Sequence, residues 1–341
     1  MHVGHIFLRN WYILILSISV LIVIIGGTTR LTNSGLSMTT WKPITGILPP
    51  ISDSQWIQEF EEYKKYPEFN KINHSMTLTE FKYIFFWEYF HRLMGRFLGL
   101  AIIIPYLFLS FKNMLHTYDK KNILVMILLV IIQGGVGWYM VKSGLIDNPD
   151  VSHFRLALHL LMAFIFMGFV LWHILDLYKI KEQNKYKSSS AVLLSYLFFG
   201  FLLLQTCYGA FSAGLNSGIG YNTFPLMNGS LLPVDIFTNN NILYSLLNDR
   251  YPIQFVHRSI AFILVFLSLI MLYDALSNPH NQIYRNSVFM VLGALFIQFL
   301  LGVITLVYVV PLSTALLHQL FGCILFLISV RHLWIVNKFI R

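Results

Sequence analysis

Eight apolar runs, each long enough to cross a lipid bilayer, constrain this chain more than any other feature of its sequence. A transmembrane helix needs about 20 consecutive, mainly apolar residues. The runs lie near Trp11–Gly27, Glu88–Phe111, Ile123–Val141, Ser152–Leu177, Ala191–Ala213, Pro252–Ala275, Ser287–Val310 and Leu312–Val336. Charged residues make up only 11% of the chain, whereas soluble domains use about 25%. The sequence therefore predicts an all-α membrane protein with eight transmembrane helices and excludes a soluble enzyme.

The lysines and arginines predict how these helices are oriented, because short cytoplasmic loops are enriched in both residues. The loops and tails on the side of the N-terminus carry Arg9, Lys112, Lys120, Lys121, Lys179, Lys181, Lys185, Lys187, Arg285, Arg331, Lys338 and Arg341. The short loops on the other side carry only Lys142, Arg155 and Arg250. We therefore expect both termini to be cytoplasmic. The basic residues form no stripe with aromatic residues, so nucleic acid is not an expected partner of this chain, whose net charge is +9.

The chain also repeats itself once. His91-Arg92 opens the second span and His257-Arg258 opens the sixth. The other matching segments are Gln133–Val136 with Gln298–Val303, Arg155–His159 with Thr314–His318, Gly35–Ser37 with Gly214–Asn216, and Trp41–Pro43 with Phe224-Pro225. The repeat predicts two pseudo-symmetric four-helix bundles in the same orientation, formed by residues 1–185 and 186–341.

Four histidines occupy equivalent places near the start of the second, fourth, sixth and eighth spans: His91, His159, His257 and His318. We expect their rings to lie at one depth, because these spans all begin on the outer side. Two parallel helices with one imidazole each can clamp a flat macrocycle, and haem iron accepts two axial imidazoles. A lone intramembrane histidine is more often a hydrogen-bonded core residue, but four in register favour two bis-histidine haem sites.

Other metal sites or proton pathways would need residues that are scarce here. Zinc would require further Cys, Asp or Glu ligands nearby, and a proton relay would require acids and bases through the bilayer. The two cysteines, Cys207 and Cys323, lie in apolar runs and are expected to pack as small apolar side chains. His173 and His332 could support a deeper haem layer, but they lack partner histidines and sit beside tryptophans, as interfacial residues do.

Two kinds of residue near the histidines have alternative interpretations. Arg92 and Arg258 could pair with haem propionates through bidentate hydrogen bonds, or could extend towards water. Several glycines could allow a helix or a flat ring to approach closely, or could serve ordinary packing of transmembrane helices. These glycines are Gly95, Gly99, Gly134, Gly135, Gly137 and Gly302.

The two halves differ one helical turn before the first histidine of each. Glu88 precedes His91 by three residues, whereas Gln254 holds the same position before His257. The i, i+3 spacing places Glu88 on the face of the histidine, where a carboxylate can accept protons, hold a water or stabilise a developing cation. The alternative is an acid favoured by the helix dipole. A catalytic role for Glu88 would place the chemistry in the first half, whereas the helix-dipole interpretation leaves the two halves equivalent.

The chain resembles the haem A synthase family in several segments. These are Gly26–Met38 followed by Trp41-Lys42-Pro43 and Pro49-Pro50, Glu88–Arg92, Gln133–Trp138, Tyr208–Ala210 with Ala213–Leu215, Phe255–Arg258, and His318-Gln319. The resemblance covers nearly the whole chain and is closest to the proteobacterial and mitochondrial type. Some bacterial members carry a cysteine pair in the first outer loop, and this chain has none, so no thiol role is inferred.

The resemblance implies an oxidoreductase that converts the C8 methyl group of haem O to a formyl group, giving haem A for terminal cytochrome oxidases. It makes His91 and His159 the ligands of the substrate haem, and Glu88 the catalytic carboxylate. It makes His257 and His318 the ligands of a prosthetic haem B. His153 could compete with His159, although the repeat favours His159.

The resemblance also implies a bacterial inner membrane location and a relation to haem O synthase and to oxidase assembly factors, with membrane lipid around the chain. The sequence does not determine whether the chain forms a homo-oligomer. The alternative functions are a dihaem b-type electron carrier that leaves its haems unaltered and a haem carrier or exporter. The difference between Glu88 and Gln254 favours the enzyme over both.

Overall fold

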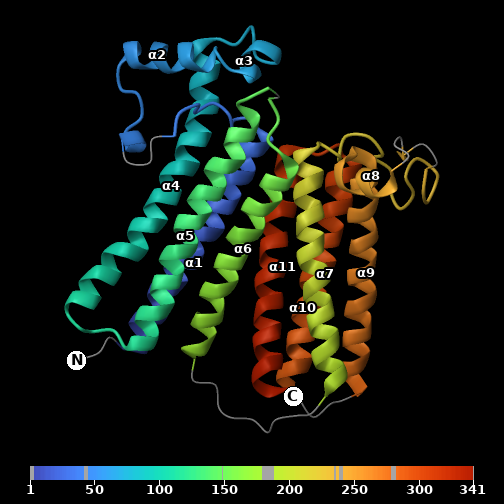
Figure 1. The fold of residues 1–341 in the computed structure, drawn as a ribbon. Coiled ribbons are helices and arrows are strands. Elements are labelled where there is room, and N and C mark those ends of the chain that lie inside the picture. The colour runs from blue at the N-terminus through green and yellow to red at the C-terminus, as the bar shows by residue number, and fades with distance from the viewer. Residues whose placement is uncertain are drawn as a thin grey trace. The chain divides into compact units, whose positions relative to one another are not determined.

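The computed structural model describes residues 4–41, 45–147, 149–178, 188–233, 236–237, 241–277 and 282–340. Among these residues, eight helices are long and apolar enough to cross a membrane (Figure 1). They are α1 (His5–Leu31), α4 (Leu78–Phe111), α5 (Thr117–Gly144), α6 (His153–Asp176), α7 (Ser189–Gly214), α9 (Arg250–Ser277), α10 (Gln282–Val307) and α11 (Leu312–Phe339). The predicted all-α membrane fold is confirmed.

Two of these helices have bounds that hydropathy alone does not reveal. Helix α4 begins well before the apolar run, because Thr77 and Glu80 form a capping box that starts the helix in polar sequence. Helix α10 ends before the apolar run does. Val309 and Val310 adopt φ values of 59° and 58°, which a helix cannot continue through.

Short helices, which the sequence analysis did not predict, occupy the loops. The loop between α1 and α4 contains η1 (Thr45–Ile47), α2 (Asp53–Tyr63) and α3 (Pro67–Lys71), and the loop between α7 and α9 contains α8 (Ile242–Asn248). Figure 1 shows α2 and α3 at one end of α4. Their core consists of Phe60, Tyr63, Phe81, Ile84 and Phe85. Aromatic burial therefore holds this segment onto the first turns of α4.

Glu68 of α3 is a buried carboxyl group in this segment, only 5% exposed. The Tyr63 hydroxyl donates a hydrogen bond to Glu68 Oε2 over 2.9 Å. Burial raises the pKa of Glu68 to about 7, more than the bond from Tyr63 lowers it.

The chain divides into two compact units, residues 1–166 and 167–341. In the first unit, α4 packs on α1, α2 and α5. In the second, α7 packs on α9, α9 on α10, α10 on α11, and α11 on α7, which closes a four-helix arrangement. The pseudo-symmetric pair of bundles formed by residues 1–185 and 186–341 stays a prediction.

His332 is packed inside the second unit, and its expected depth near the membrane interface stays a prediction. Its side chain is 2% exposed. The Ser195 hydroxyl is 2.8 Å from Nε2, and the Ser287 hydroxyl is 2.8 Å from Nδ1. Both ring nitrogens have a partner, so His332 is a hydrogen-bonded core histidine.

Candidate functional site

In the first unit, each of the two candidate ligand histidines packs against a glycine of the preceding long helix. A Cβ atom built on Gly26 of α1 would lie 2.9 Å from Cε1 of His91 on α4. A Cβ atom built on Gly137 of α5 would lie 2.9 Å from Cε1 of His159 on α6. The two histidines are close enough to interact electrostatically. The structure therefore brings this predicted pair together.

The second unit repeats the arrangement. A Cβ atom on Gly209 of α7 would lie 3.3 Å from Cε1 of His257 on α9, and one on Gly302 of α10 would lie 2.9 Å from Cε1 of His318 on α11. His257 and His318 likewise lie near enough for a charge on one ring to act on the other. Helices α4, α6, α9 and α11 thus each place one imidazole against the main chain of the transmembrane helix that precedes it in the sequence.

Several polar atoms around these rings are buried without a hydrogen-bond partner. They are the Oε1 atoms of Gln133, Gln205 and Gln298, whereas the rings of His91, His257 and His318 have main-chain hydrogen bonds to Ile22, Gln205 and Gln298. Buried polar atoms are nearly always paired in proteins, so such a cluster indicates a ligand. Among the described residues, no group of three or more His, Cys, Asp or Glu side chains could hold a metal ion. Paired imidazoles therefore fit haem, which takes two axial protein ligands, better than zinc.

Glu88 is a buried carboxylate whose oxygens are all engaged. Its Oε2 atom accepts hydrogen bonds from the Ser37 hydroxyl at 2.8 Å and from the Met38 N–H at 2.7 Å. Its Oε1 atom accepts from the Arg92 guanidinium at 2.5 Å. Arg92 also donates to the carbonyl oxygens of Met38 and Thr40. Glu88 and Arg92 together fasten the loop after α1 onto α4, one turn from His91.

Arg258 does the same for the second unit. Its guanidinium donates to the carbonyl oxygens of Tyr221 at 2.5 Å and Thr223 at 3.0 Å. The Gln254 amide also donates to Tyr221, at 3.3 Å. Both arginines therefore anchor loop carbonyl groups, an arrangement that the sequence analysis missed. Pairing of either arginine with a haem propionate stays a prediction.

These anchors correct one part of the sequence repeat. The first loop turns at Asn33, with φ of 50°, and the second turns at Asn216, with φ of 52°. The turn residues and the anchored carbonyl groups are related by one constant offset, which pairs Gly35 with Gly218. The earlier pairing with Gly214 was wrong, because Gly214 is still the last residue of α7.

The two units differ beside the histidines. In the second unit, Phe262 stacks on Phe224 with ring centroids 6.1 Å apart, and Phe299 packs edge-on against Phe262 at 5.6 Å. In the first unit the positions of Phe262 and Phe299 are held by Arg96 and Gly134. A Cβ atom on Gly134 would meet no atom within 4 Å. The second unit therefore has three packed aromatic rings here, whereas the first unit has Arg96, Gly134 and the Trp41–Trp138 pair, whose ring centroids are 5.8 Å apart.

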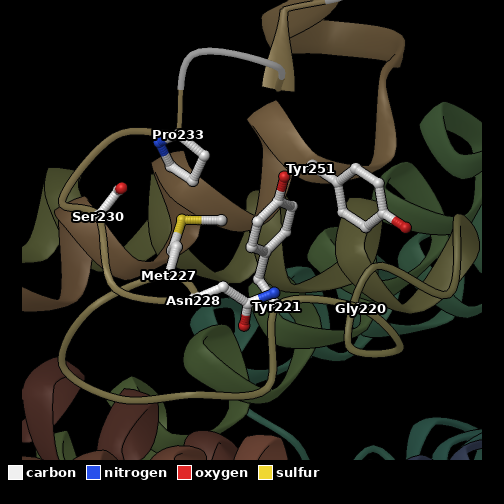
Figure 2. Close-up of a pocket in the computed structure, with 7 residues that line it drawn as sticks. All are labelled: Gly220, Tyr221, Met227, Asn228, Ser230, Pro233 and Tyr251. Carbon is white, nitrogen blue, oxygen red and sulfur yellow. The ribbon is translucent and has the colours of Figure 1, made fainter.

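His153, the rival of His159, begins α6 with its ring centroid 4.2 Å from that of Phe154. An open pocket of about 440 Å³ lies elsewhere, in the loop between α7 and α9 (Figure 2). It is lined by Gly220, Tyr221, Met227, Asn228, Ser230, Pro233 and Tyr251. None of the predicted site residues lines this pocket, so its size alone does not locate the function.

Sequence reasoning missed Gly26 and Gly209 as neighbours of the histidines. It also missed the three glutamines Gln133, Gln205 and Gln298, each four residues before such a glycine. The recurrence of Gln-x-x-x-Gly in three spans was the signal that could have found them.

Comparison with known proteins gives one consistent family. Residues 9–330 match the family described as cytochrome oxidase assembly protein. A Heme A synthase of Pelagibacter ubique is 45% identical over 95% of this chain and 94% of the relative. Relatives of the same name in Flavobacterium johnsoniae and Rickettsia bellii are 42% and 39% identical, over 88% and 93% of this chain and 89% and 95% of their own lengths.

Proposed function

We propose that this chain, which belongs to the cytochrome oxidase assembly protein family, is a haem A synthase. It would oxidise the C8 methyl group of haem O to a formyl group, in two rounds of hydroxylation followed by loss of water. This is a four-electron oxidation, so an external oxidant has to accept the electrons. The observation that carries the proposal is the pair of imidazoles in each unit, each set against a glycine, in a chain whose relatives are named for this activity.

The two histidine pairs would have different tasks. We assign the substrate haem to His91 and His159, and a prosthetic haem B to His257 and His318. The aromatic rings of Phe224, Phe262 and Phe299 support this assignment. Rings packed on one another suit a group that stays bound, whereas a glycine with free space around it, Gly134, suits a substrate that must enter and leave from lipid.

The bound haem iron supplies the redox chemistry, and the protein supplies position and electrostatics. His91 and His159 would orient the ring. Glu88 is the candidate catalytic residue, next to the histidine face of α4. Because Ser37, Met38 and Arg92 hold its oxygens, Glu88 is better suited to act as a fixed charge near the methyl group than as a swinging base.

The proposed setting follows from the same family membership. Both termini would be cytoplasmic, in a bacterial inner membrane. A farnesylating haem O synthase would supply the substrate, and oxidase assembly would consume the product. The apolar tail of haem O explains why the site belongs between transmembrane helices and not in a soluble enzyme.

Chromatography of acid-extracted haem tests the function directly. Cells that make haem O but lack any other haem A synthase would express the full chain, and we expect the haem O pool to convert to haem A. A His91→Ala/His159→Ala chain, produced at the same level, is the matched control and should leave haem O unaltered. Unconverted haem O beside a wild-type chain that carries bound haem would instead favour a dihaem electron carrier.

A further inference from the structure

We propose that four glycines, one on each of α1, α5, α7 and α10, are positioning residues that fix the four candidate ligand imidazoles, and that a glutamine amide supports three of these rings but not His91. The glycines are Gly26, Gly137, Gly209 and Gly302. The proposal rests on the proposed function, since it assigns these residues a task towards haem.

The distances leave no room for a side chain at three of the four glycines. A Cβ atom at Gly26, Gly137 or Gly302 would lie 2.9 Å from an imidazole carbon, closer than carbon atoms approach without repulsion. Because the imidazole also has to direct a nitrogen at iron, it cannot simply swing away without losing that direction. At Gly209 the distance is 3.3 Å, so a small movement of His257 would suffice.

Other glycines of the same helices show that this contact is specific. Gly200 on α7 and Gly293 on α10 each precede the contacting glycine by nine residues. A Cβ atom at either position would meet no atom within 4 Å. The helices therefore do not need glycine for general packing, and these two positions provide matched controls.

The glutamines occupy the helical turn before three of these glycines. An i, i+4 spacing puts the amide and the glycine on one face of the helix. The amide nitrogens lie 3.2 Å from His159 Nδ1 for Gln133, 3.4 Å from His257 Nε2 for Gln205, and 3.4 Å from His318 Nε2 for Gln298. Each ring thus packs edge-on against a glycine and has an amide at one nitrogen, which is Nδ1 in His159 and Nε2 in His257 and His318.

The buried amide oxygens indicate what the glutamines do. When one imidazole nitrogen binds a metal, the other carries a hydrogen and needs an acceptor, which fixes the ring orientation. The Oε1 atoms of Gln133, Gln205 and Gln298 are buried without a partner. The main-chain groups of Gln205 and Gln298 already hydrogen-bond His257 and His318, so each amide, by turning about its last side-chain bond, could offer its oxygen to the ring as a second acceptor.

The first helix is the exception. Four residues before Gly26 is Ile22. Its main chain hydrogen-bonds His91, as the main chains of Gln205 and Gln298 do for His257 and His318, but Ile22 has no amide side chain. His91 is therefore the ligand with the least support, and it lies in the unit that we assign to the substrate. A weaker ligand at this place would allow the substrate haem to leave more readily than the prosthetic one.

Replacing each glycine by alanine in the full-length, detergent-purified protein tests the first part. Haem content and the low-spin optical and electron paramagnetic resonance spectra are measured for each half. We expect Gly302→Ala to weaken retention of the second-half haem by about 10- to 100-fold, with high-spin character in what remains. Gly26→Ala and Gly137→Ala should do the same in the first half, and Gly209→Ala should have a smaller effect.

The retained haem of the unaltered half reports that each variant is folded. Gly200→Ala and Gly293→Ala should keep the wild-type content and spectra. A wild-type spectrum for Gly302→Ala, or an equal loss in Gly293→Ala, would overturn the role of the glycines while leaving the proposed function intact. A wild-type protein that binds no haem at all would instead overturn the proposed function.

Reduction potentials test the glutamines, because an acceptor at the imidazole N–H makes the ligand more basic and favours ferric iron. We expect Gln298→Leu to raise the midpoint potential of the second-half haem, and Gln298→Glu to restore or lower it. Ile22→Gln should lower the potential of the first-half haem. Unchanged potentials in Gln298→Leu and Ile22→Gln would overturn the role of the amide.

Discussion

Replacing Glu88 by glutamine tests whether this carboxylate acts in the proposed reaction or only holds the loop after α1 in place. The second unit already has an amide at this position, because Gln254 contacts the carbonyl group of Tyr221. Glu88→Gln therefore makes the two units alike at one residue without changing the size of the side chain. We expect haem to stay bound and haem A formation to fall sharply.

The structure sets the size of the structural cost. Glu88 accepts hydrogen bonds from Ser37, Met38 and Arg92, and an amide can accept through only one of its two terminal atoms. Removing one partner of a buried ion pair costs about 3–5 kcal/mol. Arg92 would still donate hydrogen bonds to the carbonyl groups of Met38 and Thr40. We therefore expect the free energy of unfolding to fall by about 3 kcal/mol, which would loosen the loop without unfolding the helices.

The expected loss of activity is larger than this anchoring change explains. A preorganised electrostatic group contributes about 100- to 1,000-fold to a rate, so haem A formation should fall at least about 100-fold at equal haem occupancy. The assay is chromatography of extracted haem, normalised to bound haem. Glu61→Gln removes an exposed carboxylate of α2 and should leave formation unchanged. Wild-type turnover in Glu88→Gln would refute any role of the carboxylate in the chemistry.

Three further predictions concern groups outside the reaction itself. Arg258→Met should release the carbonyl group of Thr223 and speed amide hydrogen exchange in that loop, while a lasting second-half haem spectrum would show that propionate binding is not its main task. Because burial raises the pKa of Glu68 to about 7, the native state binds this proton more tightly than the unfolded chain does. The free energy of unfolding of the wild type should therefore fall as pH rises from about 4.5 to 7. Glu68→Gln should remove this pH dependence and raise the free energy of unfolding by up to ~3 kcal/mol above pH 7, as measured by thermal unfolding at a series of pH values. Ser195→Ala should leave one nitrogen of His332 unpaired and cost about 1–3 kcal/mol in thermal stability without changing haem content.

The transmembrane part of the fold was readable from the sequence because lipid imposes a simple rule on chain composition. Twenty apolar residues have one stable form in a bilayer, a helix that satisfies its own hydrogen bonds. The ends of the helices were less readable. The capping box at Thr77 and the left-handed residues at Val309 and Val310 act through local backbone geometry, which hydropathy does not describe.

The site was readable only as a set of residue types. The repeat identified four histidines and set Glu88 against Gln254, because equivalent positions can be compared within one chain. The partners of Arg92 and Arg258 were not readable, since both are main-chain carbonyl groups and every residue carries one. The contacts of Gly26 and Gly209 could not be predicted for a similar reason, because a glycine in a sequence does not identify the side chain that packs against it.

In each half of the chain, an arginine anchor joins two positions that are far apart in the sequence, and the connection between them differs in length between the halves. Arg92 reaches back over 52 positions to Thr40, whereas Arg258 reaches back over 35 to Thr223. The longer connection holds α2, α3 and their aromatic core. Because each arginine holds the chain on both sides of this connection, segments can be added or removed within it at little cost in loop-closure entropy. The turns that carry His91 and His257 then keep their places.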